Sequence, residues 1–452
     1  MYRRPVFANV TGIRMIKTVR RVCRMTHYLG IVVLFSGATT YADTTAFTGA
    51  TIMPVSGPPI ENGVLVIEDD KIRDVGANVR VPRNAEVIDV SGMVIVPGFV
   101  DTHSHIGEPA GADRSAPIQP EARVLDSINV RDAGFKRALA GGITTVNVLS
   151  GSGHLMSGQT LYVKLREGNR IEEIAYRRED GSVLGGMKMA NGTNPRRDPP
   201  FPGTRAKAAA LVRQQFVEAQ EYVRKIEAAD GDDEKMPERN LGMEAMAEVL
   251  RGERIVHHHT HRHDDVMSVL RLQEEFGFRV VLHHVSEAHR VANEIAAANA
   301  PVSLIMIDSP GGKLEAQFVD IKSAPALEQA GAKVAFHTDD YITDSRLFMR
   351  QAALGIRAGM TRETALEALT IAGAEMMDLQ DRVGTLERGK DADFVILSGD
   401  PFSVYTRVQE TWVEGIKRFD IDDPDDQAVA EGGFGVLLPS ALVEFHGYGE
   451  GH

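Results

Sequence analysis

The sequence predicts an α/β fold in which a TIM-like (β/α)8 barrel is joined to a small β-sandwich formed from both ends of the chain. After Phe99, short apolar runs alternate with helical stretches, and eight such runs can be counted. Alternation of strands with helices indicates a parallel sheet, and eight strands suit a closed barrel. The segments on either side of this region are β-rich. A chain of 452 residues can hold one large barrel and one small accessory domain.

The barrel is assigned to residues 98–380. The buried run ITTVNVL at 143–149 follows a Gly-Gly pair, which is typical of a helix C-terminus. The other strands predicted after the first are 159–165, 185–189, 253–259, 278–284, 302–307 and 333–339. The clearest predicted helices are 206–229, 264–276 and 361–377. Thr361 is expected to cap the last of these, and Asp264 and Asp265 are expected to cap the one at 264–276.

The two β-rich flanks are residues 43–97 and 381–430, and we expect them to combine into one small sandwich. The first contains a hairpin with its turn at Asp69-Asp70. The second contains a turn and strand at 383–397 and a further strand at 411–416. Residues 431–452 form a glycine-rich acidic tail to which no structure is assigned.

The charge of the chain limits its partners. The formal net charge is −13, but residues 1–42 hold seven basic residues and no acidic one, which leaves 43 basic against 63 acidic residues in the body. Such a body argues against nucleic acid and anionic membrane as partners. Cys23 is the only cysteine, so the body has no disulfide framework, cysteine–zinc site or cysteine nucleophile.

Residues 1–42 resemble a secretory signal peptide. A basic segment precedes the apolar run at 28–35, and Thr40-Tyr41-Ala42 offers a cleavage site. The apolar run is too short to span a bilayer as a helix. We therefore expect a periplasmic or secreted protein with no membrane attachment after cleavage, or a cytoplasmic one if the leader is not functional.

Side chains that bind metals stand at the ends of four predicted strands. His103 and His105 end the first strand, and their i, i+2 spacing makes both side chains point the same way. The fifth strand runs into the histidine cluster at 257–263, the sixth into His283-His284, and the eighth into 337–340. The C-terminal ends of barrel strands meet at one mouth. Several histidines with one carboxylate suit zinc, iron or manganese.

These motifs resemble the amidohydrolase superfamily, in particular its imidazolonepropionase-like branch of metal-dependent amide hydrolases. The matching pieces extend over residues 46–419: PGFVDTHSH at 97–105, AGGITTV at 140–146, the histidine clusters, HTDD at 337–340 and VGTLERGKDADFVIL at 383–397. The resemblance implies a distorted (β/α)8 barrel with a β-sandwich made from both termini. It also implies one or two divalent metals per chain, zinc above all. The ligands implied are His103, His105, His259, His284 and Asp339.

Further expectations concern the fifth, sixth and fourth strands. His261 shares its facing with His259 and is its rival as the fifth-strand ligand. His283 is expected to point away from the site that His284 faces. Lys188, on the fourth strand, stands where some members carry a carbamylated lysine that bridges two metals. Otherwise Lys188 is a surface or substrate-binding cation.

The resemblance implies hydrolysis of a carbon–nitrogen bond in an amide, peptide-like or cyclic amide substrate, with a dipeptidase- or carboxypeptidase-like activity as one form. A metal ion would lower the pKa of a water from about 16 to about 7, and Asp339 would take its proton and pass it to the leaving nitrogen. His154, His261 and Arg262 are the candidate substrate-binding residues. Homo-oligomerisation is a further expectation.

Two other functions stay open at this point. Deaminases of the superfamily usually carry a glutamate three residues after the fifth-strand histidine. This chain has Arg262 there, which counts against deamination and favours a substrate with a carboxylate. The other function is a non-catalytic, metal-binding periplasmic protein. The presence of all the ligands argues against it.

Overall fold

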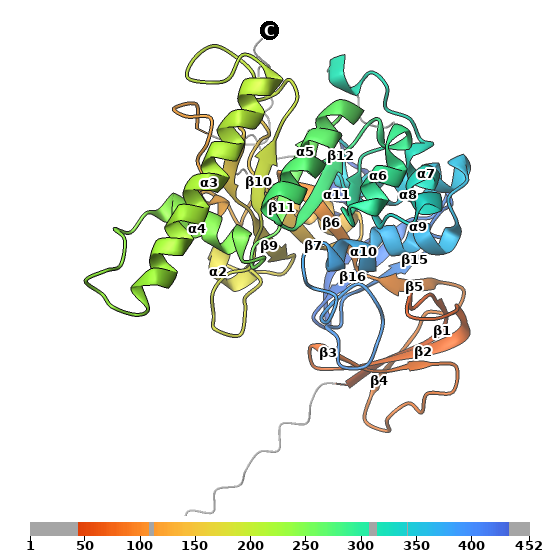
Figure 1. Ribbon diagram of the computed structural model, residues 1–452. Helices are drawn as coiled ribbons and strands as arrows, with labels where there is room; N and C mark the ends of the chain where they lie inside the picture. Colours follow the sequence, from red (N-terminus) through yellow and green to blue (C-terminus); the bar gives the residue numbers. More distant parts are fainter. Residues whose placement is uncertain (1–43, 108–112, 307–313, 341, 434–452) are drawn as a thin grey trace, which may run out of the picture. The chain divides into compact units, whose positions relative to one another are not determined.

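The computed structural model describes residues 44–107, 113–306, 314–340 and 342–433 (Figure 1). The predicted signal peptide and residues 434–452 of the predicted tail lie outside these ranges. Within them, every helix is too short or too polar to span a membrane.

One sheet carries most of the parallel strands. Its order is β14-β13-β12-β11-β10-β8, and the five strands from β10 to β14 pair in parallel. Every residue of these five strands is buried, as expected for strands covered on both faces. Their bounds are β10 Met187–Ala190, β11 Val256–Thr260, β12 Val280–His284, β13 Val302–Leu304 and β14 Val334–Phe336.

A second sheet has the order β6-β7-β9, with β6 (Phe99–Ser104) parallel to β7 (Ile143–Val148). Backbone hydrogen bonds tie it to the first sheet at both edges. Ser104 forms a parallel bridge with Asp340 after β14, and the amide of Thr160 donates to the carbonyl of Gly186 before β10. The ends of β6 and β14 therefore lie together, which places residues far apart in the chain at one site.

The predicted strand at 159–165 is wrong in detail. Residues 156–164 form two short strands, β8 (Met156–Gln159) and β9 (Leu161–Lys164), which meet at Thr160. Both are antiparallel to their partners, β8 to β10 and β9 to β7. The apolar pattern identified extended backbone but could not reveal its direction.

Helices cover these strands on the outside, where α5 contacts β11 and α7, α8 and α9 contact β14 (Figure 1). The helix predicted at 361–377 is divided at Thr370 into α9 and α10, and Thr361 caps α9 as predicted by accepting from the amide of Thr364. The helices are α1 Ala133–Ala140, α2 Ile171–Ile174, α3 Arg205–Ala229, α4 Leu241–Leu250, α5 His263–Phe276, α6 Ala292–Ala297, α7 Ser323–Ala330, α8 Phe348–Ala358, α9 Arg362–Leu369, α10 Ile371–Glu375 and α11 Pro424–Glu431. Short 3-10 segments are η1 Val124–Asp126, η2 Ala288–Arg290, η3 Leu314–Ala316 and η4 Ser345–Leu347.

Both ends of the described chain contribute to one eight-stranded sheet. Its order is β17-β16-β15-β5-β1-β2-β3, with β4 also paired to β1. The first flank supplies β1 Thr44–Ile52, β2 Ile60–Glu68, β3 Lys71–Gly76, β4 Glu86–Asp89 and β5 Val94–Pro97. The second supplies β15 Phe394–Leu397, β16 Val408–Val413 and β17 Ile416–Asp420. Their arrangement as a sandwich stays a prediction.

Two local expectations for this sheet can be compared with the structure. The hairpin with its turn at Asp69-Asp70 is present as β2 and β3. The single strand predicted at 411–416 is wrong, because β16 ends at Val413 and β17 begins at Ile416. Glu414 and Gly415 take positive φ and form the turn between them.

A buried ionic cluster joins the terminal sheet to β9. Lys164 Nζ contacts the carboxylate of Asp391 and lies 3.0 Å from Asp393 and 3.6 Å from Glu414. Lys71 and Arg382 also pair with Asp391.

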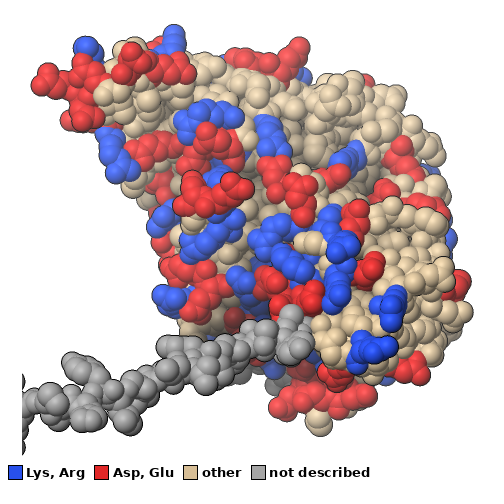
Figure 2. Space-filling model, turned by 90° about the horizontal axis from the view of Figure 1, so that it is seen from below, with Lys and Arg blue, Asp and Glu red and all other residues tan. Residues whose placement is uncertain are grey.

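On the face drawn in Figure 2, basic and acidic side chains are interspersed. The expectation that the chain binds no nucleic acid stays a prediction.

Candidate metal centre

The end of β6 places two histidines beside a carboxylate from the segment after β14. His105 Nε2 lies 2.9 Å from Asp339 Oδ1, and His103 Nε2 lies 3.3 Å from the same oxygen. His105 Nδ1 is 2.8 Å from the carbonyl of Leu149, so an N–H at that position donates to it and leaves Nε2 as the ligand nitrogen. One ligand atom from each of the three residues lies within 4.8 Å of the others, which is a possible metal-binding group.

Asp339 is held in place by its own backbone. Its amide donates to the carbonyl of His103 at 2.8 Å, and its φ is +50°. This left-handed backbone lies three residues after the end of β14 and turns the side chain towards the end of β6. The structure thus brings together three of the residues that the sequence predicted to meet.

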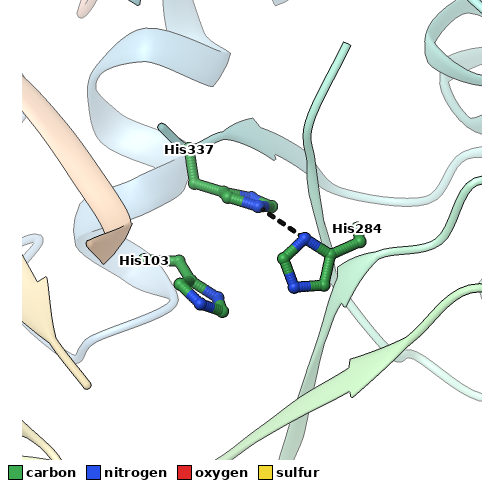
Figure 3. Close-up of side chains that lie close together, drawn as sticks. All are labelled: His103, His284 and His337. Carbon is green, nitrogen blue, oxygen red and sulfur yellow. Dashed lines mark hydrogen bonds between the residues drawn. The ribbon is translucent and has the colours of Figure 1, made fainter. Parts of the chain in front are cut away.

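His284 and His337 form a second group with His103 (Figure 3). His337 Nε2 is hydrogen-bonded to His284 Nδ1 at 3.0 Å, and His337 Nδ1 is hydrogen-bonded to Ser303 Oγ at 2.7 Å. The sequence analysis did not propose His337 as a site residue. The signal was present, because His337 precedes Asp339 by two positions and so shares its face on an extended strand.

The expectation that His283 points away from the site is wrong. The ring centroids of His283 and His103 are 4.8 Å apart, and those of His284 and His103 are 4.9 Å apart. His284 has a φ of +71°, which ends the regular alternation of β12 at that residue. His283 is also hydrogen-bonded to His257 at 2.9 Å. Both histidines therefore lie against His103.

Lys188 lies inside the histidine cluster. Its side chain is fully buried, and Nζ is 3.3 Å from His103 Nε2. The alternative of a surface cation is wrong, because β10 is covered on both faces. The location is compatible with a metal ligand after carbamylation, which converts the amine into a carbamate.

His259 and His261, the two rivals for the fifth-strand position, lie together. Their ring centroids are 4.7 Å apart, and the ring centroid of His259 is 4.4 Å from that of His284. Glu315 joins them, with Oε1 at 3.8 Å from His259 Nε2, so that these three residues form a third possible metal-binding group. The sequence analysis missed Glu315, which lies on η3, because a glutamate outside the strand-end motifs carries no signal of its own.

Arg262 and His154 do not belong to any of the three groups. Arg262 pairs with Asp264 at 2.9 Å through a half-exposed side chain. His154 Nε2 lies 2.6 Å from the carbonyl of Asp113, and burial lowers its pKa to about 4. The prediction that Asp264 and Asp265 cap α5 is wrong. The N-cap residue is Arg262, whose side chain makes no capping hydrogen bond, and both aspartates lie in the first turn of the helix. Substrate binding by His154, His261 and Arg262 stays a prediction.

Burial sets the ionisation of the cluster. It lowers the pKa of His337 to about 3 and holds that of His103 and His284 well below the usual value. Burial alone would raise the pKa of Asp339, but the contact with His105 and the nearby His284 bring it well below its usual range. Neutral imidazoles and an ionised carboxylate are the forms that bind metals.

Hydrogen bonding in the cluster also leaves a ligand atom available for a metal ion. Among the described residues, His284 Nε2 is buried with no hydrogen-bond partner. A buried polar atom left in this state costs free energy unless something satisfies it. The donor set of imidazoles and one carboxylate suits zinc and similar divalent ions.

Comparison with known proteins places the chain in a family. Residues 94–424 match the amidohydrolase family, and the chain belongs to it. The resemblance to the amidohydrolase superfamily is confirmed. Family membership and the structural similarity described next give the chain a TIM-barrel-like α/β fold.

Three relatives illustrate the similarity. A solved amidohydrolase structure from Thermotoga maritima MSB8 is 32% identical, covers 83% of this chain and 100% of its own, and has a TM-score of 0.77. The amidohydrolase tasK of Hapsidospora irregularis is 26% identical over 396 residues, which are 81% of this chain and 40% of that protein. An imidazolonepropionase of Streptomyces griseus subsp. griseus is 27% identical over 160 residues, 29% of this chain and 41% of the relative. The chain thus spans about two fifths of the length of these two curated relatives.

Proposed function

We propose that this chain is a metal-dependent hydrolase that cleaves a carbon–nitrogen bond in an amide, a peptide-like compound or a cyclic amide. The observation that carries the proposal is the meeting of His103, His105 and Asp339 at the adjoining ends of β6 and β14. Membership of the amidohydrolase family supports this class of reaction. In this proposal the fold is a closed (β/α)8 barrel with a terminal β-sandwich.

His103, His105 and Asp339 would hold one divalent ion, with zinc as the expected metal. His259 and His284 would hold a second ion if two are bound, and a carbamylated Lys188 would contribute to both. Carbamylation adds carbon dioxide to the neutral amine, forms an N–C bond and releases one proton. When bound, the metal supplies a Lewis acid beside the scissile carbonyl.

Asp339 is proposed as the group that moves the proton. His105 Nε2 lies 2.9 Å from Oδ1, whereas His284 Nδ1 lies 3.9 Å from Oδ2. Oδ2 is therefore the oxygen that would accept a proton from the attacking water. The same oxygen would then donate this proton to the leaving nitrogen.

The substrate class is proposed from the positive charge near the fifth strand. Arg262 follows His259 by three residues, and its guanidinium is half-exposed. N-acyl amino acids and dipeptides carry a carboxylate that such a group would bind. Its pairing with Asp264 would have to open for this contact. His154 and His261 are the other proposed substrate contacts.

Export is proposed separately, from the leader alone. Cleavage after Ala42 would release the body into the periplasm or the medium. Intact mass of the protein recovered from these compartments tests this proposal, since retention of residues 1–42 in the exported protein would contradict it.

The catalytic proposal is tested with Asp339→Asn. The variant should lose about 10²–10⁴-fold in the rate of amide hydrolysis, because general acid–base catalysis contributes that much. Asp378→Asn is the matched control, since Asp378 is an exposed carboxylate that pairs with Arg279. Assays on N-acyl amino acids, dipeptides and cyclic amides should follow amine or acid release. Full activity of metal-loaded Asp339→Asn would contradict the role of Asp339.

A further inference from the structure

A cluster of possible metal ligands lies apart from the residues at β6 and β14 and consists of Glu315 and the two histidines beside it. We propose that His259, His261 and Glu315 together hold a divalent metal ion, so that both histidines of the fifth-strand motif are ligands. One ligand atom from each lies within 4.8 Å of the others, and all three residues are buried. The site shares no residue with the group of His103, His105 and Asp339.

The backbone of the loop after β10 holds the Glu315 carboxylate. The amide of Thr193 donates to Oε2 at 2.7 Å, which fixes one oxygen. Gly192 has a φ of +79°, and a Cβ at that position would lie 2.4 Å from Oε2. The glycine therefore allows a close approach that any other residue would block. The position of the Glu315 carboxylate is therefore set by the backbone at Gly192 and Thr193.

The second oxygen of Glu315 is the most direct indication of a ligand. Oε1 is buried and makes no hydrogen bond to any described residue, and the whole residue is 3% exposed. It lies 3.8 Å from His259 Nε2, which is beyond a good hydrogen bond. A metal ion between these two atoms would satisfy the oxygen with bonds of about 2.0–2.2 Å.

His261 is oriented as a histidine ligand usually is. His261 Nδ1 is hydrogen-bonded to Ser286 Oγ at 2.8 Å, which fixes the ring and makes Nε2 the ligand nitrogen. The His261 ring stacks on His284 at 5.0 Å, and His284 also lies 4.9 Å from His103. His284 thus separates the proposed site from the one at β6.

The ligand set defines the class of metal. Two imidazoles and one carboxylate suit zinc, manganese or iron in the divalent state, and three protein ligands leave positions for water or substrate. This assignment takes His261 away from substrate binding, and it makes His261 and Glu315, in place of His284, the partners of His259 at the second ion. The alternative is a histidine–glutamate ion pair that binds no metal.

The test locates the metal and counts it. The full chain, loaded with zinc, should give two anomalous-scattering peaks in a crystal, one of them within about 2.2 Å of His259, His261 and Glu315. Glu315→Gln should lose that peak and about one zinc per chain by elemental analysis, while the peak beside Asp339 stays. Ser286→Ala, a milder change, should weaken binding at the same position by about 10–100-fold.

Glu287→Gln is the matched control, because Glu287 is also a buried carboxylate next to a histidine, His263, outside the proposed site. It should keep the wild-type zinc content. No peak at His259, His261 and Glu315 in a protein with zinc beside Asp339 would overturn the proposal, as would an unchanged zinc content in Glu315→Gln. Neither result bears on the proposed hydrolase function. That function is contradicted separately if a protein with all its metal bound hydrolyses no amide.

Discussion

The backbone amide of Asp339 donates a hydrogen bond of 2.8 Å to the carbonyl oxygen of His103. This bond joins a residue near the end of β6 to a residue three positions after β14, although the two are 236 positions apart in the sequence. Because main-chain atoms make the connection, the spacing between the two backbone segments that carry these side chains does not depend on the rotamers. A site built on such a connection is pre-organised before any ligand arrives.

Lys188 provides the first prediction. If it is carbamylated, protein equilibrated with zinc and ¹³C-bicarbonate should give one carbamate carbon signal by NMR, and Lys188→Met should abolish it. The variant should also lose metal, because it lacks the oxygen ligands. Lys207→Met, at an exposed position of α3, should keep the signal. A wild-type protein with full metal and no such signal would show that Lys188 acts as an amine.

The buried ionic cluster provides the second prediction. Lys164→Met should lower the free energy of unfolding by about 3 kcal/mol, because it leaves buried carboxylates with less compensating charge. Lys71 and Arg382 still pair with Asp391, so the effect should be at the lower end of the range for such changes. Denaturant unfolding measures it. Arg213→Met, which removes an exposed pair with Glu275, should cost less than about 1 kcal/mol. Equal losses in the two variants would contradict the role given to burial.

Asp391 links stability to pH and gives the third prediction. Burial would raise its pKa, but Lys164, Lys71 and Arg382 outweigh burial and lower it to about 2. A carboxyl group whose pKa is lower in the folded state stabilises the fold above its unfolded pKa of about 3.9, and this contribution is lost as pH falls towards 2. It amounts to about 2.5 kcal/mol at neutral pH.

The comparison of wild type with Asp391→Asn isolates this contribution from other titrating groups. The wild type should be the more stable at pH 6, and its advantage should shrink as the pH is lowered from 4 to 2. Unfolding free energies at several pH values measure the difference. An advantage that does not change over this range would show that Asp391 is not held ionised by the cluster.

The sequence was informative where local geometry decides the outcome. The spacing of His103 and His105 on one strand predicted a shared facing, and both contact Asp339 in the structure. The alternation rule failed at His283 because His284 adopts a positive φ, which depends on packing at the end of β12. Glu315 could not be found at all, since its approach to His259 depends on Gly192 and Thr193, more than a hundred residues away in the chain.

Removal and return of the metal tests the central claim most directly. The purified chain is assayed on a panel of N-acyl amino acids, dipeptides and cyclic amides before chelation, after chelation, and after zinc is restored, with metal content measured on the same samples. We predict that hydrolysis falls to background when the metal is removed and recovers in proportion to the zinc regained. Undiminished hydrolysis by a chelated sample without measurable metal would contradict the account, and so would an inactive protein with every metal site filled.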